Sequence, residues 1–274
     1  MSKKGLNRDY KIVQQMRIAT FAFCILFTHQ LFAQDVWIDQ KKCAVCLTYD
    51  DGINIDLDNV IPALDSLGLK ATFYVPGNST SLNNRMDEWQ SVAKEGHELG
   101  NHTLFHPCFG KSMNRAWVTA DNDLDNYSVQ RMVDEIEVAN TLLKAVDGKS
   151  ERTFAYTCGD QVIGGEKIWD KIKNDFIAAR GVNGELPNIN EIDFSDIGSY
   201  MINGQSGDEL INLVKNALAK NSLIVFLFHG VGGGHDINVS LEAHSELLHF
   251  LKDNEKDIWV APLIEVAKYA KNNK

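Results

Sequence analysis

Short apolar runs alternate with amphipathic segments along most of the chain. Apolar runs rich in β-branched and aromatic residues are typical of strands, whereas apolar positions spaced three or four apart are typical of helices. Residues 223–228 are entirely apolar, which predicts a strand buried on both faces. We expect strands at residues 43–49, 71–75, 98–102, 153–156, 176–179, 223–228 and 258–261. We expect helices at residues 56–67, 84–95, 129–146, 163–174, 209–218, 241–251 and 263–270.

The regular order of strand and helix predicts an α/β fold in which helices cover a parallel sheet. About seven strands in roughly 240 residues fit a (β/α) barrel better than two domains. No repeat and no Pro/Gly/Ser-rich linker divides this part of the chain. Residues 107–127 and 181–207 lack a clear periodicity, and we expect them to be loops on the binding face.

The first 33 residues have a different pattern. Basic residues precede a short apolar run at residues 18–28, and Ala33 is a small residue at a suitable cleavage point before Gln34. This pattern is typical of a secretory signal, and the run is shorter than the roughly 20 apolar residues that span a bilayer. A buried N-terminal helix is the alternative. We expect residues 1–33 to be a signal peptide and residues 34–274 to form one exported, periplasmic or extracellular domain.

This expectation predicts the N-terminus of the exported protein. N-terminal sequencing should find a mature chain that begins at or near Gln34. Recovery of exported protein that still carries residues 1–30 would contradict the signal-peptide interpretation.

Charge narrows the choice of partners. The 274 residues include 27 basic and 37 acidic ones, for a formal net charge of −10. Residues 1–33 contain five basic residues and one acidic residue, so the remainder carries −14. A nucleic-acid-binding protein needs a basic face to neutralise phosphates, so the composition argues against one. A neutral or weakly charged substrate suits this domain better.

Four cysteines remain after Cys24 of the expected signal. Cys43 and Cys46 lie in a strand-like run, where residues three apart point to opposite faces. A zinc knuckle would need a second such pair, which the sequence lacks. We expect Cys43, Cys46, Cys108 and Cys158 to be buried thiols, although an exported chain can also pair them.

Three polar clusters each follow an expected strand, at the end where parallel α/β folds place their active sites. Asp50 and Asp51 precede Gly52, which allows a sharp turn that directs both carboxylates inward. The i, i+4 spacing of His102 and His106 places both rings on one face of a helical turn. Two imidazoles and one carboxylate form a three-ligand set that is typical of a catalytic metal site. The third cluster contains His229, between the apolar strand and a Gly-rich stretch.

Together these clusters resemble the polysaccharide deacetylase family, which is the NodB-homology group or carbohydrate esterase family 4. The resemblance rests on three motifs and covers roughly residues 43–270. It implies a distorted (β/α) barrel of about seven parallel strands. It also implies a metal-dependent hydrolase that removes acetyl groups from a polysaccharide. The motifs are Thr48-Tyr49-Asp50-Asp51-Gly52, His102-Thr103-Leu104-Phe105-His106-Pro107 and Phe228-His229-Gly230.

The resemblance also implies a role for each matching residue. Asp51, His102 and His106 would bind a divalent metal, usually zinc or a similar ion such as cobalt, nickel or manganese. Asp50 would be the general base and His229 the general acid. The backbone N–H of Cys158 would contribute to the oxyanion hole.

The chain departs from the family in two places. The family's Arg-x-Pro-Tyr-Gly motif corresponds to Ala155-Tyr156-Thr157-Cys158-Gly159, so Ala155 replaces the arginine that normally orients the base. The Asp/Trp motif that supports the acid histidine has no clear match, and residues 181–184 are its expected position. These departures leave all five central residues in place.

Several alternatives remain open. The substrate is an O-acetylated glycan such as xylan, or an N-acetylated glycan such as peptidoglycan or a chitin-like chain. A non-catalytic glycan-binding protein that retains a metal site is the alternative function. A metal phosphoesterase fits poorly, because no basic phosphate clamp accompanies the motifs. We expect no nucleic-acid partner and no transmembrane segment, and the oligomeric state stays open.

Overall fold

The computed structural model describes residues 37–112 and 115–274. The expected signal peptide, its apolar run and its cleavage point therefore lie outside the described residues. Among the helices of the described segments, none has the length and apolar character needed to cross a bilayer.

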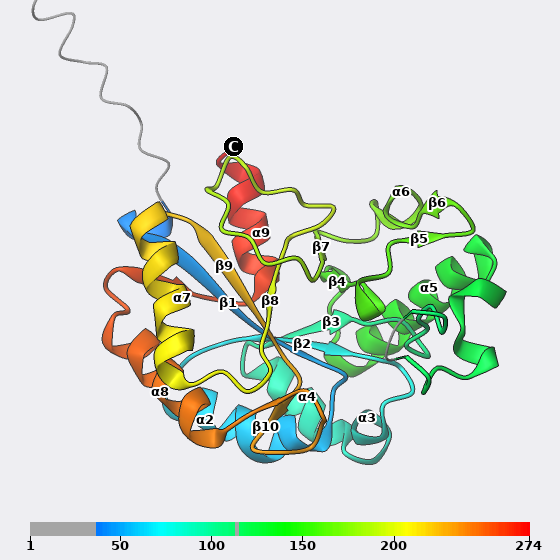
Figure 1. Ribbon diagram of the computed structural model, residues 1–274, viewed down its shortest axis with the longest axis horizontal. Helices are drawn as coiled ribbons and strands as arrows, with labels where there is room; N and C mark the ends of the chain where they lie inside the picture. The colour runs from blue at the N-terminus through cyan, green and yellow to red at the C-terminus, as the bar shows by residue number, and fades with distance from the viewer. Residues whose placement is uncertain (1–36, 113–114) are drawn as a thin grey trace, which may run out of the picture. The chain divides into compact units, whose positions relative to one another are not determined.

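One parallel sheet forms the centre of the fold (Figure 1). Its strands run in the order β7-β4-β3-β2-β1-β9-β8, and β12 pairs with the start of β1. Every pairing in this sheet is parallel, so the predicted α/β barrel architecture is confirmed. The strands are β1 (Cys43–Asp50), β2 (Thr72–Val75), β3 (Glu98–Asn101), β4 (Phe154–Ala155), β7 (Ala179–Arg180), β8 (Tyr200–Met201), β9 (Leu223–Phe228) and β12 (Ile258–Val260).

The two edges of the sheet approach each other through one short segment. Ile197 forms a parallel bridge with Arg180 of β7, and Tyr200 in β8 pairs with Phe226 of β9. The segment 197–201, which contains the edge strand β8, thus pairs with β9 and also bridges to β7 at the opposite edge, and the sheet curls into a distorted barrel. Strand β8 belongs to the stretch 181–207, which we expected to be a loop throughout.

Alternating residues of β1 pack on opposite sides of the sheet. Cys43, Val45, Leu47 and Tyr49 belong to a core cluster that includes residues of α2 (Ile61–Ser66), α4 (Met86–Lys94), α7 (Gly207–Lys220) and α8 (Leu241–Asp253). Ala44 and Cys46 belong to a second cluster, which includes residues of α9 (Leu263–Asn272). Cys43 and Cys46 therefore face opposite sides as buried free thiols, as predicted. By the same alternation, Asp50 is the last residue on the face of β1 to which Ala44 and Cys46 belong.

Helices occupy most of the connections between strands. The three longest begin after a serine whose hydroxyl accepts a hydrogen bond from the third helical N–H, which satisfies a donor that lacks a partner within the helix. The helices are α2 (Ile61–Ser66), α3 (Thr80–Asn84), α4 (Met86–Lys94), α5 (Val129–Asp147), α6 (Trp169–Ile172), α7 (Gly207–Lys220), α8 (Leu241–Asp253) and α9 (Leu263–Asn272). The remaining helical segments are 3-10 turns, except η2, which is a short π-helix: η1 (Ile38–Gln40), η2 (Asp56–Val60), η3 (Ala120–Asn122), η4 (Leu124–Asn126) and η5 (Thr157–Gly159).

The predicted helix at residues 163–174 is wrong. Strands β5 (Val162–Ile163) and β6 (Glu166–Lys167) form an antiparallel hairpin there, and only the single turn of α6 follows. Gly164 and Gly165 both have positive φ, which is the conformation that a two-residue hairpin turn of the primed type requires. A second small pair, β10 (Gly230–Val231) and β11 (Asn238–Val239), follows β9.

Candidate active site

The residues predicted to form the site come together at one edge of the sheet. Asp50 is the last residue of β1, His102 follows β3, and His229 follows β9. Because all these strands are parallel, their carboxyl ends share one edge. The imidazole Nε2 of His229 lies 3.9 Å from Asp51 Oδ2, although these residues are far apart in the sequence.

Asp51, His102 and His106 form a compact group. Their ligand atoms all lie within 4.8 Å of one another. Asp51 Oδ1 lies 3.7 Å from His102 Nε2 and 3.3 Å from His106 Nε2. The two ring nitrogens thus face the same carboxylate oxygen.

Asp51 reaches this position through an unusual backbone turn. Its φ is 75°, in the left-handed region that L residues rarely adopt, and Gly52 follows with a φ of 51°. A Cβ on Gly52 would lie 2.8 Å from Val75 Cγ1, so glycine is also needed for space. The hydroxyls of Ser79 and Ser81 both donate to the carbonyl oxygen of Gly52 and hold the turn.

The prediction that His102 and His106 share one face of a helical turn is wrong. The segment after β3 is a loop in which Thr103 and His106 have φ values of 64° and 52°. Side chains hold this loop: the Thr103 N–H donates to Asn101 Oδ1, and the His106 N–H donates to Thr103 Oγ1. The loop brings both rings to Asp51 without a helix.

A hydrogen bond on its other ring nitrogen orients His102. Nδ1 lies 3.0 Å from the carbonyl oxygen of Ala155, which only accepts, so Nδ1 carries the proton. Burial lowers the pKa of His102 to about 4, and the neighbouring carboxylates oppose this shift only partly. The ring is therefore neutral near pH 7, with the lone pair of Nε2 directed towards Asp51.

Arg180, which none of the sequence motifs predicts, orients Asp50. Its Nη2 lies 2.5 Å from Asp50 Oδ1 and also contacts Oδ2, and the arginine is fully buried. Burial raises the pKa of the Asp50 carboxyl, but the charge of Arg180, with help from neighbouring histidines, outweighs it and keeps the pKa below 3.8. Asp50 is thus held as an anion at the centre of the site.

Arg180 lies directly beside Ala155, the residue that we expected in place of the family's arginine. Ala155 and Arg180 are Cα partners in the pairing of β4 with β7, so a cation is present at the directly paired position on the next strand. The sequence contained a signal for it: Arg180 is a charged residue at the end of an expected apolar strand, as Asp50 is.

His229 is packed against a second imidazole. Its ring stacks on that of His235, with centroids 4.7 Å apart and an interplanar angle of 18°. Among the described residues, the buried Nδ1 of His229 has no hydrogen-bond partner. Residues 181–184, the expected position of the Asp/Trp motif, therefore supply no hydrogen bond to Nδ1 of His229. Burial lowers the pKa of His229, and the charges of Asp50 and Asp51 oppose the shift.

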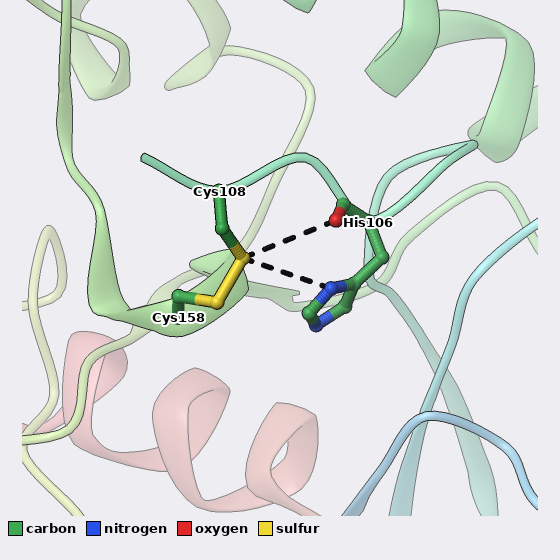
Figure 2. Close-up of side chains that lie close together, drawn as sticks. All are labelled: His106, Cys108 and Cys158. Atoms are coloured by element: carbon green, nitrogen blue, oxygen red, sulfur yellow. Dashed lines mark hydrogen bonds between the residues drawn. A yellow bond between two sulfur atoms is a disulfide. The ribbon is translucent and has the colours of Figure 1, made fainter. Parts of the chain in front are cut away.

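A disulfide lies directly beside this group. Cys108 and Cys158 are bonded, which corrects the expectation that both are thiols (Figure 2). Cys108 Sγ lies 3.7 Å from Nδ1 of His106, on the side of the ring away from Asp51. The bond joins the loop of His106 to the turn η5, which contains the expected oxyanion donor.

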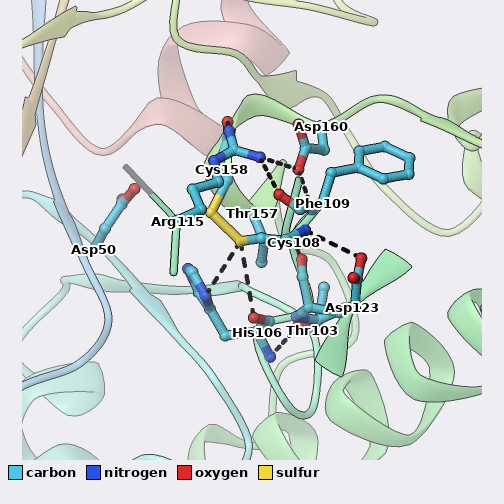
Figure 3. Close-up of a disulfide and its surroundings, with 12 residues drawn as sticks. Asp50, Thr103, His106, Cys108, Phe109, Arg115, Asp123, Thr157, Cys158 and Asp160 are labelled. Atoms are coloured by element: carbon cyan, nitrogen blue, oxygen red, sulfur yellow. Dashed lines mark hydrogen bonds and ion pairs between the residues drawn. A yellow bond between two sulfur atoms is a disulfide. The ribbon is translucent and has the colours of Figure 1, made fainter. Parts of the chain in front are cut away.

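Polar contacts join the same two segments around the disulfide (Figure 3). Arg115 Nη1 lies 2.6 Å from Asp160 Oδ2, and its Nη2 donates to the carbonyl oxygen of Cys158 over 2.8 Å. Thr157 Oγ1 donates to the carbonyl oxygen of Pro107 over 2.5 Å. The two segments are therefore held together at several points.

The donor set of Asp51, His102 and His106 fits a divalent cation. One carboxylate and two imidazole nitrogens leave coordination positions open, as catalytic zinc sites do. The hydrogen bond from His102 Nδ1 to a backbone carbonyl is the kind of outer contact that orients metal-binding histidines. A second group, His106 with Cys108 and Cys158, offers no thiolates because its two sulfurs are bonded to each other.

Comparison with known proteins assigns the chain to a family independently of the geometry of the site. The family model described as polysaccharide deacetylase matches residues 38–173, which include Asp50, Asp51, His102 and His106. The chain is 36% identical over 73 residues to a peptidoglycan-N-acetylglucosamine deacetylase of Bacillus cereus, covering 26% of each chain. It is 26% identical over 261 residues to a gellan lyase of a Bacillus species, covering 86% of this chain and 10% of the relative. The chain thus spans about a quarter or less of these relatives' length.

Solved structures share the fold. A candidate polysaccharide deacetylase from Mycobacterium smegmatis superimposes with a TM-score of 0.58 at 13% identity, over 86% of this chain and 92% of that one. The Xyl-CE4 domain of a multidomain xylanase, from the hindgut metagenome of Trinervitermes trinervoides, gives 0.51 at 21% identity, over 82% and 89%. A mutant of BA3943, a pseudoenzyme of carbohydrate esterase family 4, gives 0.52 at 16% identity, over 83% and 67%. Since the family model aligns with both the Asp-Asp and the His-x-x-x-His segments, and the barrel is shared with these structures, the chain belongs to the polysaccharide deacetylase family.

Proposed function

We propose that this protein is an exported, metal-dependent hydrolase that removes acetyl groups from a polysaccharide. One observation carries the proposal: a buried anion, Asp50, lies next to a complete three-residue metal-binding group. Arg180 contacts Asp50 and keeps it charged, and His229 Nε2 lies 3.9 Å from Asp51 Oδ2. The side chains that the proposal needs as base, acid and cation ligands thus lie within one small volume.

The proposed reaction divides between these residues. A divalent cation held by Asp51, His102 and His106 would activate a water molecule and polarise the acetyl carbonyl. Asp50 accepts the proton of the attacking water, which its charged state permits. His229, when protonated, gives a proton to the leaving sugar oxygen or nitrogen.

The backbone N–H of Cys158 is the proposed oxyanion donor. Cys158 has a φ of 56°, and its disulfide places the turn η5 beside His106. A backbone donor does not depend on the side chain, so cysteine can replace the family's tyrosine here. One such donor is worth roughly 3–4 kcal/mol of transition-state stabilisation.

Aromatic side chains beside the metal-binding group suit a sugar ring. Trp117 is 58% exposed, and its ring centroid lies 6.1 Å from that of His106. Phe105, next to His106 in the sequence, is also exposed. Exposed aromatic faces stack on the apolar faces of sugars, so we place the glycan chain along this side of the site. The proposal includes both N-acetylated and O-acetylated glycans, because one relative is a peptidoglycan-N-acetylglucosamine deacetylase and the fold is shared with the Xyl-CE4 domain of a multidomain xylanase.

Acetate release from a panel of acetylated glycans tests the proposal. The panel should include acetylated xylan, chitin oligosaccharides and peptidoglycan fragments. A chelator should lower acetate release by at least about a hundredfold, and added zinc or cobalt should restore it, because the cation supplies several kcal/mol to the reaction. The same protein without a chelator serves as the reference.

The alternative is a glycan-binding protein without activity. The altered arginine motif and the structural similarity to a family pseudoenzyme motivate it. No acetate release from any glycan by the metal-loaded protein, combined with measurable glycan binding, would favour this alternative. The buried pair of Asp50 and Arg180 argues against it, since binding alone needs no charged base.

A further inference from the structure

The imidazole of His229 lacks the hydrogen bond that usually orients a proton-transferring histidine. Such a ring is normally held through the nitrogen that does not react. Nδ1 of His229 is buried, and it has no hydrogen-bond partner within residues 37–112 and 115–274. His102, by contrast, is held through its Nδ1 by a backbone carbonyl. Within the chain, another contact is therefore needed to keep Nε2 of His229 near Asp51 Oδ2.

The ring of His235 supplies such a contact. It stacks on His229 with centroids 4.7 Å apart and an interplanar angle of 18°, as in offset-stacked aromatic pairs. Nε2 of His235 lies 3.7 Å from Asp51 Oδ2, and Nε2 of His229 lies 3.9 Å from the same oxygen. The two rings are therefore nearly parallel and face one carboxylate oxygen. Rotation of His229 about its Cα–Cβ bond would separate the two faces, so the stack opposes that rotation.

The chain between the two histidines holds His235 in this place. The N–H of Ile237 donates to Nδ1 of His235 over 2.9 Å, and the N–H of Gly230 donates to the carbonyl oxygen of Ile237 over 3.0 Å. Gly230 directly follows His229, so these two bonds connect the backbone of one histidine to the ring of the other. A Cβ on Gly230 would lie 2.4 Å from the carbonyl oxygen of Gly233, so glycine permits this close return of the chain.

We propose that His235 is a positioning residue for the proton donor of the reaction. Its ring stacks on His229 and holds Nε2 of that residue towards the site, in place of a hydrogen bond to Nδ1. This inference rests on the proposed role of His229 as the acid, and it adds the residue that places this acid.

Other roles for His235 lead to different expectations. The compact group of Asp51, His102 and His106 does not include it, so the metal content should not depend on it. A residue that contacts the substrate would change KM when it is removed. Stacking requires only a flat ring over His229.

Three substitutions separate the ring of His235 from its hydrogen bond. His235→Ala removes both. His235→Phe keeps a flat aromatic ring but has no ring nitrogen. His235→Asn has no ring but keeps an oxygen that can accept the N–H of Ile237. The side chain of His235 is 32% exposed, so none of these changes leaves a cavity in the core.

The kcat of acetate release, measured on the most active glycan of the panel above, should depend on the ring. It should fall about 10- to 100-fold in His235→Ala and His235→Asn, because a displacement of about 1 Å costs up to about 100-fold in rate. His235→Phe should retain most of the kcat. KM should stay close to that of the unchanged protein, and elemental analysis should find the same zinc content in all four proteins.

Crystal structures of the zinc-loaded proteins give a readout that does not depend on activity. The ring of His229 should keep its position in His235→Phe. It should rotate away or occupy two positions in His235→Ala and His235→Asn. If the unchanged protein released no acetate from any glycan, the proposed function would fail, while the position of His229 would still decide the inference.

Several results would overturn the inference. One is full kcat in His235→Ala with His229 in its original position. Another is His235→Phe that is no more active than His235→Ala, because the ring nitrogens and not the flat face would then be required. A raised KM at unchanged kcat would identify a substrate contact, and loss of zinc would identify a metal ligand. Either of these results contradicts a positioning role.

Discussion

Asp50→Asn should retain its metal and lose about two to four orders of magnitude in the rate of acetate release. The amide cannot take a proton from water, and a general base contributes roughly this factor. The metal-binding group of Asp51, His102 and His106 does not include Asp50, so the metal content should stay close to that of the unchanged protein. Elemental analysis and acetate release, measured on the same preparation, check both parts.

Asp51→Asn is the matched variant at the neighbouring carboxylate. It replaces an anionic ligand with a neutral amide, so its metal content should fall sharply, and excess metal should restore part of the rate. If Asp50→Asn lost the metal while Asp51→Asn kept it, the two roles would be reversed. If Asp50→Asn were fully active, the deacetylase mechanism would be wrong for this chain.

The fold was predictable because the strands are strongly apolar and regularly spaced. The run at residues 223–228 became β9 at the same bounds, and residues 43–49 became most of β1. Two errors have local causes. Ile163, Ile168 and Ile172 are buried with near-helical spacing, but the two glycines at 164 and 165 form a hairpin turn instead. Strand β8 has only two residues, too few for any periodicity.

The site was predictable as a set of residues but not as a geometry. The motifs identified Asp50, Asp51, His102, His106 and His229, and the structure brings these side chains together. Their spacing gave the wrong local structure for the two histidines, because positive φ values at Thr103 and His106 depend on side-chain contacts that no simple pattern encodes. The disulfide joins residues 50 positions apart, and sequence separation alone does not select a pairing.

Arg180 is the clearest example of a site residue that the sequence pattern does not identify. A family motif records which position usually contains the arginine, whereas the chemistry requires only a cation beside Asp50. The pairing of Ala155 with Arg180 exists only in the folded sheet, so the placement of a cation beside Asp50 becomes visible only there. Substitution of Arg180 should therefore have a large effect, although no motif includes it.

Arg180→Ala should destabilise the protein by about 3–5 kcal/mol near pH 7, because it leaves the buried charge of Asp50 without a partner. In the unchanged protein the pKa of Asp50 is lowered, so its pairing with Arg180 contributes stability above the ordinary pKa of 3.8 and loses it as the pH falls through the lowered value. In the variant, burial alone raises the pKa of Asp50, so acid relieves the unpaired charge. The difference in unfolding free energy between the unchanged protein and Arg180→Ala should therefore shrink as the pH falls. Urea denaturation of both proteins at several pH values measures this difference.

The same substitution should change the pH profile of acetate release. The acidic limb should move to higher pH, because Asp50 takes up a proton more readily without Arg180. Arg180→Lys keeps a positive charge and should retain more of the rate and of the original profile than Arg180→Ala. The exchange variant Ala155→Arg/Arg180→Ala returns the cation to the family's position on the paired strand and should recover part of the lost rate. An acidic limb that stayed in place in Arg180→Ala would show that Arg180 does not set the charge state of the base.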